Sequence, residues 1–132
     1  MPIEFAQIKH GEIYSRQTLA ALWGYKTFHA LARGVVTPRA DNKIVLFVTE
    51  NKQLSSEQYE DKLNGEELDW EGPRDHFAEK RMLDASASGE EIHLFHRDQH
   101  HTEFAYIGQL EISHTELHTD KPSKFRFLVK SK

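Results

Sequence analysis

Cysteine is absent from the 132 residues of this chain, and its absence removes several functional classes at once. Without thiols there is no disulfide framework, no zinc–thiolate centre and no cysteine nucleophile. Long apolar runs are also missing, since none approaches the ~20 residues that a membrane-spanning helix needs. The first residues, Met-Pro-Ile-Glu-Phe, lack the basic and apolar regions of a signal peptide. We therefore expect a cytoplasmic protein without a membrane partner.

The overall composition is typical of a globular protein, with 38% hydrophobic and 29% charged residues. The length lies within the usual span of one domain and allows one substantial core. The sequence shows no internal repeat and no low-complexity segment. Residues 1–132 are therefore expected to form a single domain.

Charge is spread unevenly along the chain, although the net charge is only −4. Residues 16–43 carry five basic side chains against one acid, and the tail after Asp120 carries five basic side chains and no acid. Residues 50–91 hold 13 acids and five bases. Such segregation predicts a basic face suited to nucleic acid and an acidic one, or simply two solvated surfaces.

The pattern of apolar residues predicts a mostly β fold. Residues 43–49 (KIVLFVT) form a nearly continuous β-branched and aromatic run, typical of a strand buried on both faces. Residues 59–63 and 67–70 flank Asn64-Gly65, a strong hairpin dipeptide. Further strands are expected at 91–97, 104–112 and 124–129. With about six strands and two or three short helices outside them, we predict an α+β fold with a curved sheet or small barrel.

Three segments read as short helices. Residues 15–23 have Ser15 as a plausible N-cap, and Gly24 is suited to end the helix. Residues 26–32 are expected to form a further helical turn. Residues 74–87 form the third candidate, with Pro73 well placed near its start.

The stretch from Tyr59 to Gly72 carries the functional argument. It has the form Tyr59-Glu60-Asp61, then a glycine, then Trp70-Glu71-Gly72. Two aromatic rings can sandwich a planar base, and stacking contributes roughly 1–3 kcal/mol per base. A carboxylate between them can accept a hydrogen bond from the exocyclic amine of cytosine. The alternative is plain packing, because aromatic pairs across a hairpin usually stabilise the sheet.

This stretch resembles the SRA (SET- and RING-associated) domains of the PUA-like superfamily, which flip a modified cytosine out of DNA. The resemblance implies that Tyr59 and Trp70 stack on the base and that Asp61, or alternatively Glu60, pairs with its edge, with Gly72 completing the pocket. Phe104-Ala105-Tyr106-Ile107-Gly108 is similar to a family strand.

The chain also resembles, over residues 14–129, an uncharacterised domain at the C-terminus of some bacterial helicase–nuclease proteins. The matching motifs are Trp23-Gly24-Tyr25-Lys26, the Tyr59–Gly72 core and the strand at residues 91–95. This second resemblance implies a restriction or phage-defence context, with a helicase or nuclease as partner.

Contacts to DNA outside the pocket are expected from basic and aromatic side chains. The gap left by a flipped base would be filled from residues 33–39 or by Arg74 or His76. The predicted DNA-contacting residues are Lys26, Trp23, Tyr25, Arg33, Arg39, Arg74 and His76. Trp23 and Tyr25 have a second interpretation, because aromatic residues on a helix stripe usually belong to the core.

Catalysis has little support in the sequence. Of nine histidines, His93 and His96 are expected on opposite faces of a strand, which disfavours a shared metal. No nucleophile elbow, P-loop, H-E-x-x-H or dinucleotide motif is present. We therefore expect a binding module, not an enzyme, with no metal and no cofactor.

The function predicted from the sequence is that of a reader of modified DNA. It would flip a modified cytosine of the 5-methyl or 5-hydroxymethyl type from double-stranded DNA into an aromatic pocket. The alternatives are a PUA-like module for modified RNA or a nucleotide ligand, and, third, a metal-dependent nuclease.

Overall fold

A computed structural model of the chain describes residues 5, 7–31, 34–37, 42–51, 62–72, 78–99 and 102–130. Eight strands in this part form one sheet of order β2-β3-β6-β7-β8-β5-β4, with β1 paired to the start of β7. The strands are β1 (Ile13–Tyr14), β2 (Val35–Val36), β3 (Lys43–Asn51), β4 (Lys62–Asn64), β5 (Glu67–Glu71), β6 (Glu91–Gln99), β7 (Phe104–Glu116) and β8 (Lys124–Val129).

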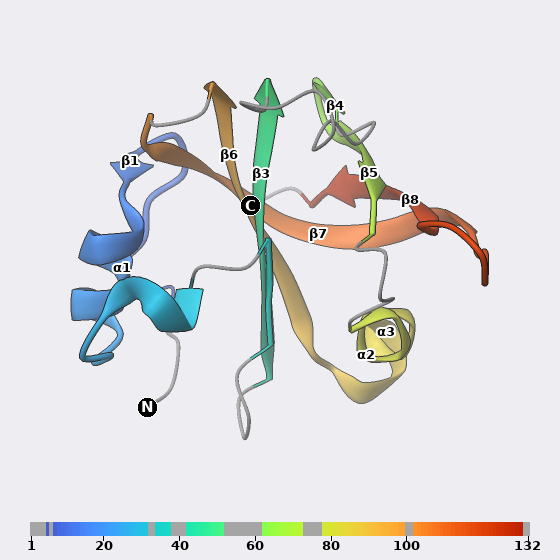
Figure 1. Cartoon of the computed structure of the whole chain (residues 1–132), viewed down its shortest axis with the longest axis horizontal. Helices are drawn as coiled ribbons and strands as arrows, with labels where there is room; N and C mark the ends of the chain where they lie inside the picture. Colours follow the sequence, from blue (N-terminus) through green and yellow to red (C-terminus); the bar gives the residue numbers. More distant parts are fainter. Residues whose placement is uncertain are drawn as a thin grey trace.

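The sheet is curved and does not close into a barrel. β3 and β6 run parallel, whereas the other pairings in the described part are antiparallel. Figure 1 shows β3 and β6 upright in the middle, with the long strand β7 sweeping from the side of α1 to the side of β8. β2 and β4 therefore form opposite edges of the main path.

β3 is buried on both faces, as its apolar run predicts. Ile44, Leu46 and Val48 belong to a core that we call the α2-side core, while Val45 and Phe47 belong to a second core on the opposite face, the α1-side core. This two-sided burial arises because side chains alternate across a strand and both faces are covered.

The two cores hold most of the described apolar side chains. The α2-side core contains Val35, Ile44, Leu46, Val48, Leu68, Trp70, Met82, Ala85, Ile92, Leu94, Leu110, Phe125 and Phe127. The α1-side core contains Ile8, Leu19, Ala20, Trp23, Leu31, Val36, Val45, Phe47, Phe95, Phe104 and Tyr106.

Short helices flank the sheet. α1 (Arg16–Leu22) begins as expected at the N-cap Ser15, whose hydroxyl accepts a hydrogen bond from the amide of Thr18 at 3.0 Å. A 3-10 turn, η1 (Phe28–Leu31), follows it. Instead of one helix over residues 74–87, the described part of that segment has α2 (Glu79–Leu83) and α3 (Ala85–Ser88), and residues 74–77 lie outside it.

The β4–β5 hairpin turns at Gly65 and Glu66, since Asn64 pairs with Glu67. Gly65 has a φ of +61°, so the glycine occupies the first central position, as in a type II′ turn. The Asn-Gly dipeptide thus predicted the hairpin, but the turn is one residue later than its usual placement.

The strand predictions at 91–97, 104–112 and 124–129 correspond to β6, β7 and β8. β1 and β2 were not predicted, because two-residue strands carry no readable alternation. No helix in the described ranges has the length and apolar character needed to cross a membrane.

Candidate nucleic-acid interface

The predicted base pocket is only partly within the described structure. β3 ends at Asn51 and β4 begins at Lys62, and Tyr59, Glu60 and Asp61 lie between them, outside the described residues. The same holds for four of the predicted DNA-contacting residues, namely Arg33, Arg39, Arg74 and His76. Their roles stay predictions.

Trp70 is not the open stacking surface that the sequence motif predicted. Its side chain is only 5% exposed and packs at ring-centroid distances of 5.6 Å from Phe125 and 5.9 Å from Phe127. The physical reason is register: Trp70 shares the inward face of β5 with Leu68, and it lies opposite Phe125 of β8. We therefore correct this prediction and place Trp70 in the α2-side core.

Gly72, predicted as part of the pocket, is buried at the end of β5. Its amide donates a hydrogen bond to the carbonyl of Ser123 at 2.8 Å, which ties the end of β5 to the approach to β8. A Cβ at this position would lie 3.6 Å from the Trp70 ring and 3.8 Å from the Phe125 ring. A side chain at position 72 would therefore touch the indole of Trp70, and Gly72 lies beside the core and not in an open pocket.

The Trp23-Gly24-Tyr25-Lys26 motif divides between core and surface. Trp23 is 3% exposed and packs against Phe5 and Phe95 in the α1-side core, so its predicted DNA contact is wrong. A C-capping residue on the buried side of α1 faces the sheet, not the solvent. Tyr25 is half-buried against the same core, whereas Lys26 is exposed and available to a polyanion.

A cleft between the start of α1, the end of β6 and the start of β7 holds two arginines that were not among the predicted site residues. We call it the Arg16–Arg97 cleft. It has a volume of about 360 Å³. The residues that line it are Ser15, Arg16, Gln17, Phe28, Arg97, Thr102, Glu103 and Phe104.

The two guanidinium groups of this cleft share one aromatic ring. The guanidinium carbon of Arg16 lies 4.9 Å from the Phe104 centroid and that of Arg97 lies 4.3 Å from it. Burial, together with repulsion from Arg97, lowers the pKa of Arg16 to about 10, so the group stays charged at neutral pH. Burial also lowers the pKa of Arg97.

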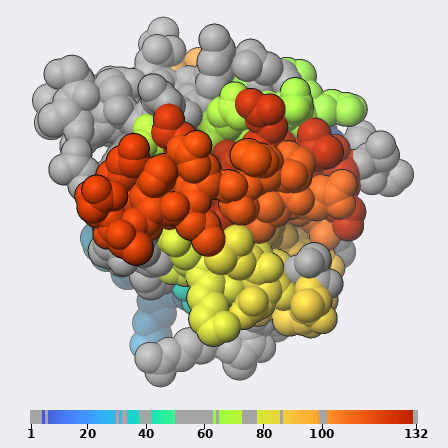
Figure 2. Space-filling view, turned by 90° about the vertical axis from the view of Figure 1, so that its right-hand side faces the viewer, coloured from blue at the N-terminus to red at the C-terminus, as the bar shows by residue number. Residues whose placement is uncertain are grey.

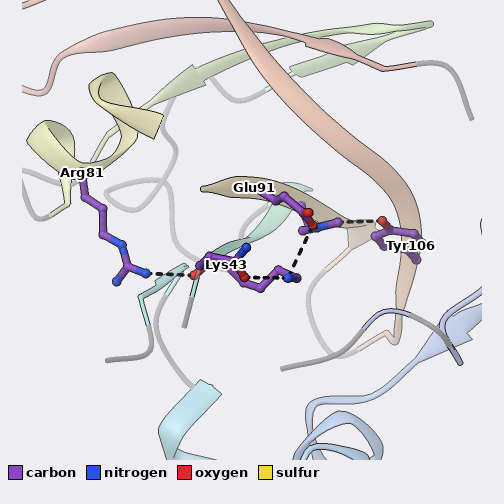
Figure 3. A network of polar contacts seen from close by, with 6 residues as sticks. Lys43, Arg81, Glu91 and Tyr106 are labelled. Atoms are coloured by element: carbon purple, nitrogen blue, oxygen red, sulfur yellow. Dashed lines mark hydrogen bonds and ion pairs between the residues drawn. The ribbon is translucent and has the colours of Figure 1, made fainter. Parts of the chain in front are cut away.

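A polar network lies on the α1 side of the sheet, at the amino ends of β3 and β6 (Figure 3). His93 contacts the Tyr106 hydroxyl through Nδ1 at 2.7 Å and the Glu91 carboxylate through Nε2 at 2.9 Å. Lys43 lies 3.6 Å from the same carboxylate. A neutral His93 with its proton on Nε2 satisfies both contacts, because Glu91 only accepts and the Tyr106 hydroxyl then donates to Nδ1.

The ionisation of this network follows from its burial. Burial lowers the pKa of His93, and the hydrogen bond to Glu91 only partly opposes it. Burial acts to raise the pKa of Glu91, but the His93 hydrogen bond and the charge of Lys43 together hold it below its ordinary value. Tyr106 has a raised pKa, mainly because it is buried. His93 and Tyr106 are both almost fully covered, so their contacts join β6 to β7 inside the protein, whereas the Glu91 carboxylate stays partly exposed.

A second hollow of about 590 Å³ lies between the two short helices α2 and α3 and the strands β6 and β7. Figure 2 views the molecule from the side on which the helices meet β7 and β8. Met82, Ile92 and Leu110 give the hollow an apolar floor. Its charged lining residues are Glu91, Glu111, Lys130 and Glu90, the last of which is paired with Arg81, so acids outnumber bases in the wall. Such a lining suits a neutral or amino-bearing molecule better than an anion.

Among the described residues, no group of three or more histidine or carboxylate side chains could hold a metal ion. His93 and Phe95 face the α1-side core, and Ile92 and Leu94 face the other, so the alternation expected along β6 is present.

A family model described as "Domain of unknown function (DUF3427)" matches residues 8–130. The chain belongs to the DUF3427 family. No curated protein matches this DUF3427 chain. Among solved structures, it is similar to the SRA domain of SUVH5, crystallised as a complex with fully methylated CG DNA. The similarity covers 100% of this chain and 95% of the SUVH5 chain, with a TM-score of 0.61 and 11% sequence identity.

The structural likeness confirms the predicted fold class and the SRA-like fold of this DUF3427 chain. The family description is silent on a helicase or nuclease context, so that context stays a prediction.

Proposed function

We propose that this chain is a reader of modified DNA that binds a modified cytosine flipped out of the duplex. The observation that carries the proposal is the SRA-like fold over the whole chain, shared with a domain that was crystallised on fully methylated CG DNA. The ordered motif Tyr59-Glu60-Asp61, Gly65 and Trp70-Glu71-Gly72 supports it from the sequence side. The domain would act as a binding module, and a nuclease or helicase partner in a defence system would supply any cleavage.

The burial of Trp70 changes how the pocket is proposed to work. Tyr59 would stack on the flipped base, and Asp61 or Glu60 would accept a hydrogen bond from the cytosine amine. Trp70 would act from the core side of the sheet. Its packing against Phe125 holds the end of β5 in place, and β5 in turn positions the paired strand β4. Its contribution to binding would then come through the position of the hairpin and not through direct stacking.

The test is a binding panel of duplexes that differ in one cytosine: unmodified, 5-methyl or 5-hydroxymethyl, at one fixed salt concentration. We expect tighter binding to one of the modified duplexes. Tyr59→Ala should reduce that affinity by about 1–3 kcal/mol. Asp61→Asn should remove the preference, because an amide can present its NH₂ where an acceptor is needed. Glu60→Gln is the matched variant that decides which carboxylate reads the base.

Non-specific binding to unmodified DNA provides the internal control. Phosphate contacts position a protein without specifying sequence, so Asp61→Asn should leave binding to the unmodified duplex almost intact. If every duplex binds equally and none of the three variants changes the ratio, the proposed reading of modified cytosine is wrong.

The hollow under α2 and α3 favours a second candidate function, the binding of a free nucleoside. Its volume of about 590 Å³ lies within the range of ligand pockets, and Glu111 in its wall could accept a hydrogen bond from the amino group of a base. A titration with modified nucleosides decides between the two candidates. Saturable shifts of Ile92 and Leu110 methyl resonances would support this second function, whereas unchanged spectra would exclude it.

A further inference from the structure

We infer that the Arg16–Arg97 cleft is a phosphate-binding site, and that its occupant is a backbone phosphate of the bound DNA. This inference rests on the proposed function for the identity of the occupant, but the recognition of a phosphate group follows from the cleft itself.

Two like charges are held together here, and neither is paired with a described carboxylate. Among the described residues, neither guanidinium forms an ion pair with a carboxylate, in contrast to Arg81 with Glu90 and Arg126 with Asp69. The charge that acts most clearly on Arg16 is the repulsive one of Arg97. Half-buried cations that repel each other are stabilised by an anion placed between them.

Hydrogen bonds inside the protein hold the side chains of Arg16 and Arg97, but some of their guanidinium N–H groups have no described acceptor. Nε of Arg16 donates to the carbonyl of Leu31 at 2.7 Å, and the two terminal nitrogens donate to no described acceptor. Arg97 donates through Nε to Thr49 at 2.7 Å and through Nη1 to the carbonyl of Thr102 at 2.9 Å, and its Nη2 donates to none in the described ranges.

Ring contacts hold both groups in place. Arg16 also lies over Phe47, at 4.7 Å from the ring centroid, so that Phe47 and Phe104 constrain its plane. Guanidinium groups held in this way lose little conformational freedom when they bind an oxyanion. Arginine is favoured for phosphate recognition for this reason and because its paired N–H donors match two phosphate oxygens.

The cleft lies beside the carboxyl end of β6, next to the end of β3. The hydrogen bond from Arg97 to Thr49 joins β6 to β3 close to Asn51, the last residue of β3. From there the chain continues to the segment that contains Tyr59 and Asp61. Figure 1 shows the ends of β3 and β6 and the strand β4 at the same end of the molecule. A phosphate bound here would therefore lie at the same end of the molecule as β4, the strand that directly follows Tyr59-Glu60-Asp61 in the sequence (Figure 1).

Glu103 opposes anion binding and provides a way to test the site. It is exposed and also lines the cleft, so it would repel a phosphate. Glu103→Gln removes this repulsion without touching Arg16, Arg97 or Phe104. The variant should bind phosphate more tightly. This test therefore works even if an arginine variant does not fold.

The first experiment is a titration of the full chain with inorganic phosphate, followed by NMR of the arginine Nε–H groups, with sodium chloride at equal ionic strength as control. We expect saturable shifts of Arg16 and Arg97 with one dissociation constant, tightened in Glu103→Gln. Arg126, already paired with Asp69, should not shift. If the two cleft arginines respond no more to phosphate than to chloride, they only clamp Phe104 and the inference is wrong.

The second experiment identifies the source of the phosphate. The slope of log affinity against log salt is measured for an unmodified duplex with the wild-type chain, Arg97→Met and the control Lys80→Met, whose side chain is solvent-exposed on α2. Arg97→Met should make the slope shallower by about 0.9, the value for one phosphate, and Lys80→Met should leave it unchanged.

The outcomes separate this inference from the proposed function. An unchanged slope in Arg97→Met, with the phosphate shifts present, would assign the cleft to a free phosphorylated compound and overturn the DNA assignment. A shallower slope without any preference for modified cytosine would support the phosphate site and reject the proposed function.

Discussion

Truncation of Trp70 to alanine should test the placement of this residue in the core. Its side chain is 5% exposed and lies against Phe125, Phe127 and the wall formed by Gly72. Truncating a buried tryptophan to alanine costs about 3–5 kcal/mol, because apolar contacts are lost and a cavity remains. For a chain of 132 residues, an unfolding entropy of about 2.1 cal/mol/K per residue converts this loss into a decrease in Tm of roughly 10–18 °C.

Urea denaturation followed by circular dichroism measures this effect directly. Trp70→Phe should recover much of the loss, since it keeps an aromatic ring against Phe125. Phe28→Ala is the matched control: Phe28 is 37% exposed, and its truncation should cost less than about 1 kcal/mol.

If Trp70→Ala costs less than about 1 kcal/mol and selectively weakens binding to modified DNA, the ring is an open stacking surface and its placement in the core is wrong.

Three further predictions concern stability. Because burial lowers the pKa of His93, the unfolded chain binds more protons than the native one below about pH 6.5, so stability should fall on acidification through that range. His93→Gln should reduce the change in the urea midpoint of unfolding between about pH 7 and about pH 5.5. If the midpoint of the variant falls as steeply as that of the wild-type chain, the lowered pKa of His93 is not its cause. Ser15→Ala removes the acceptor for the Thr18 amide and should cost about 1 kcal/mol, whereas a neutral effect would show that the cap is dispensable. Gly65→Ala should cost roughly 1 kcal/mol from backbone strain alone, because its Cβ would meet no atom within 4 Å, and a stabilised variant would refute the left-handed turn.

Regular strands were the most predictable part of this structure. The run at residues 43–49 indicated a strand buried on both faces, and β3 has this burial in the described structure. β8 (Lys124–Val129) matches its predicted bounds, because alternation between Phe125, Phe127 and polar neighbours is unambiguous. In both cases the local pattern and the tertiary environment agree.

The site was harder to predict because burial depends on what covers a residue. A tryptophan after a turn looks the same in sequence whether it stacks on a ligand or on Phe125. The alternation of Leu68 and Trp70 on one face of β5 was the available signal for a core position. The pairing of Arg16 with Arg97 had no local signal, since only the docking of α1 (Arg16–Leu22) beside the carboxyl end of β6 brings them together.

Competition binding with paired duplexes of identical sequence measures whether this SRA-like chain reads modified cytosine, as we propose. In each pair, one duplex carries a single modified cytosine and the other carries none, at the same salt concentration. We expect at least about tenfold tighter binding to one modified duplex, equivalent to about 1.4 kcal/mol, and loss of that difference in Asp61→Asn or Glu60→Gln. Equal affinity for both members of every pair would contradict the proposal.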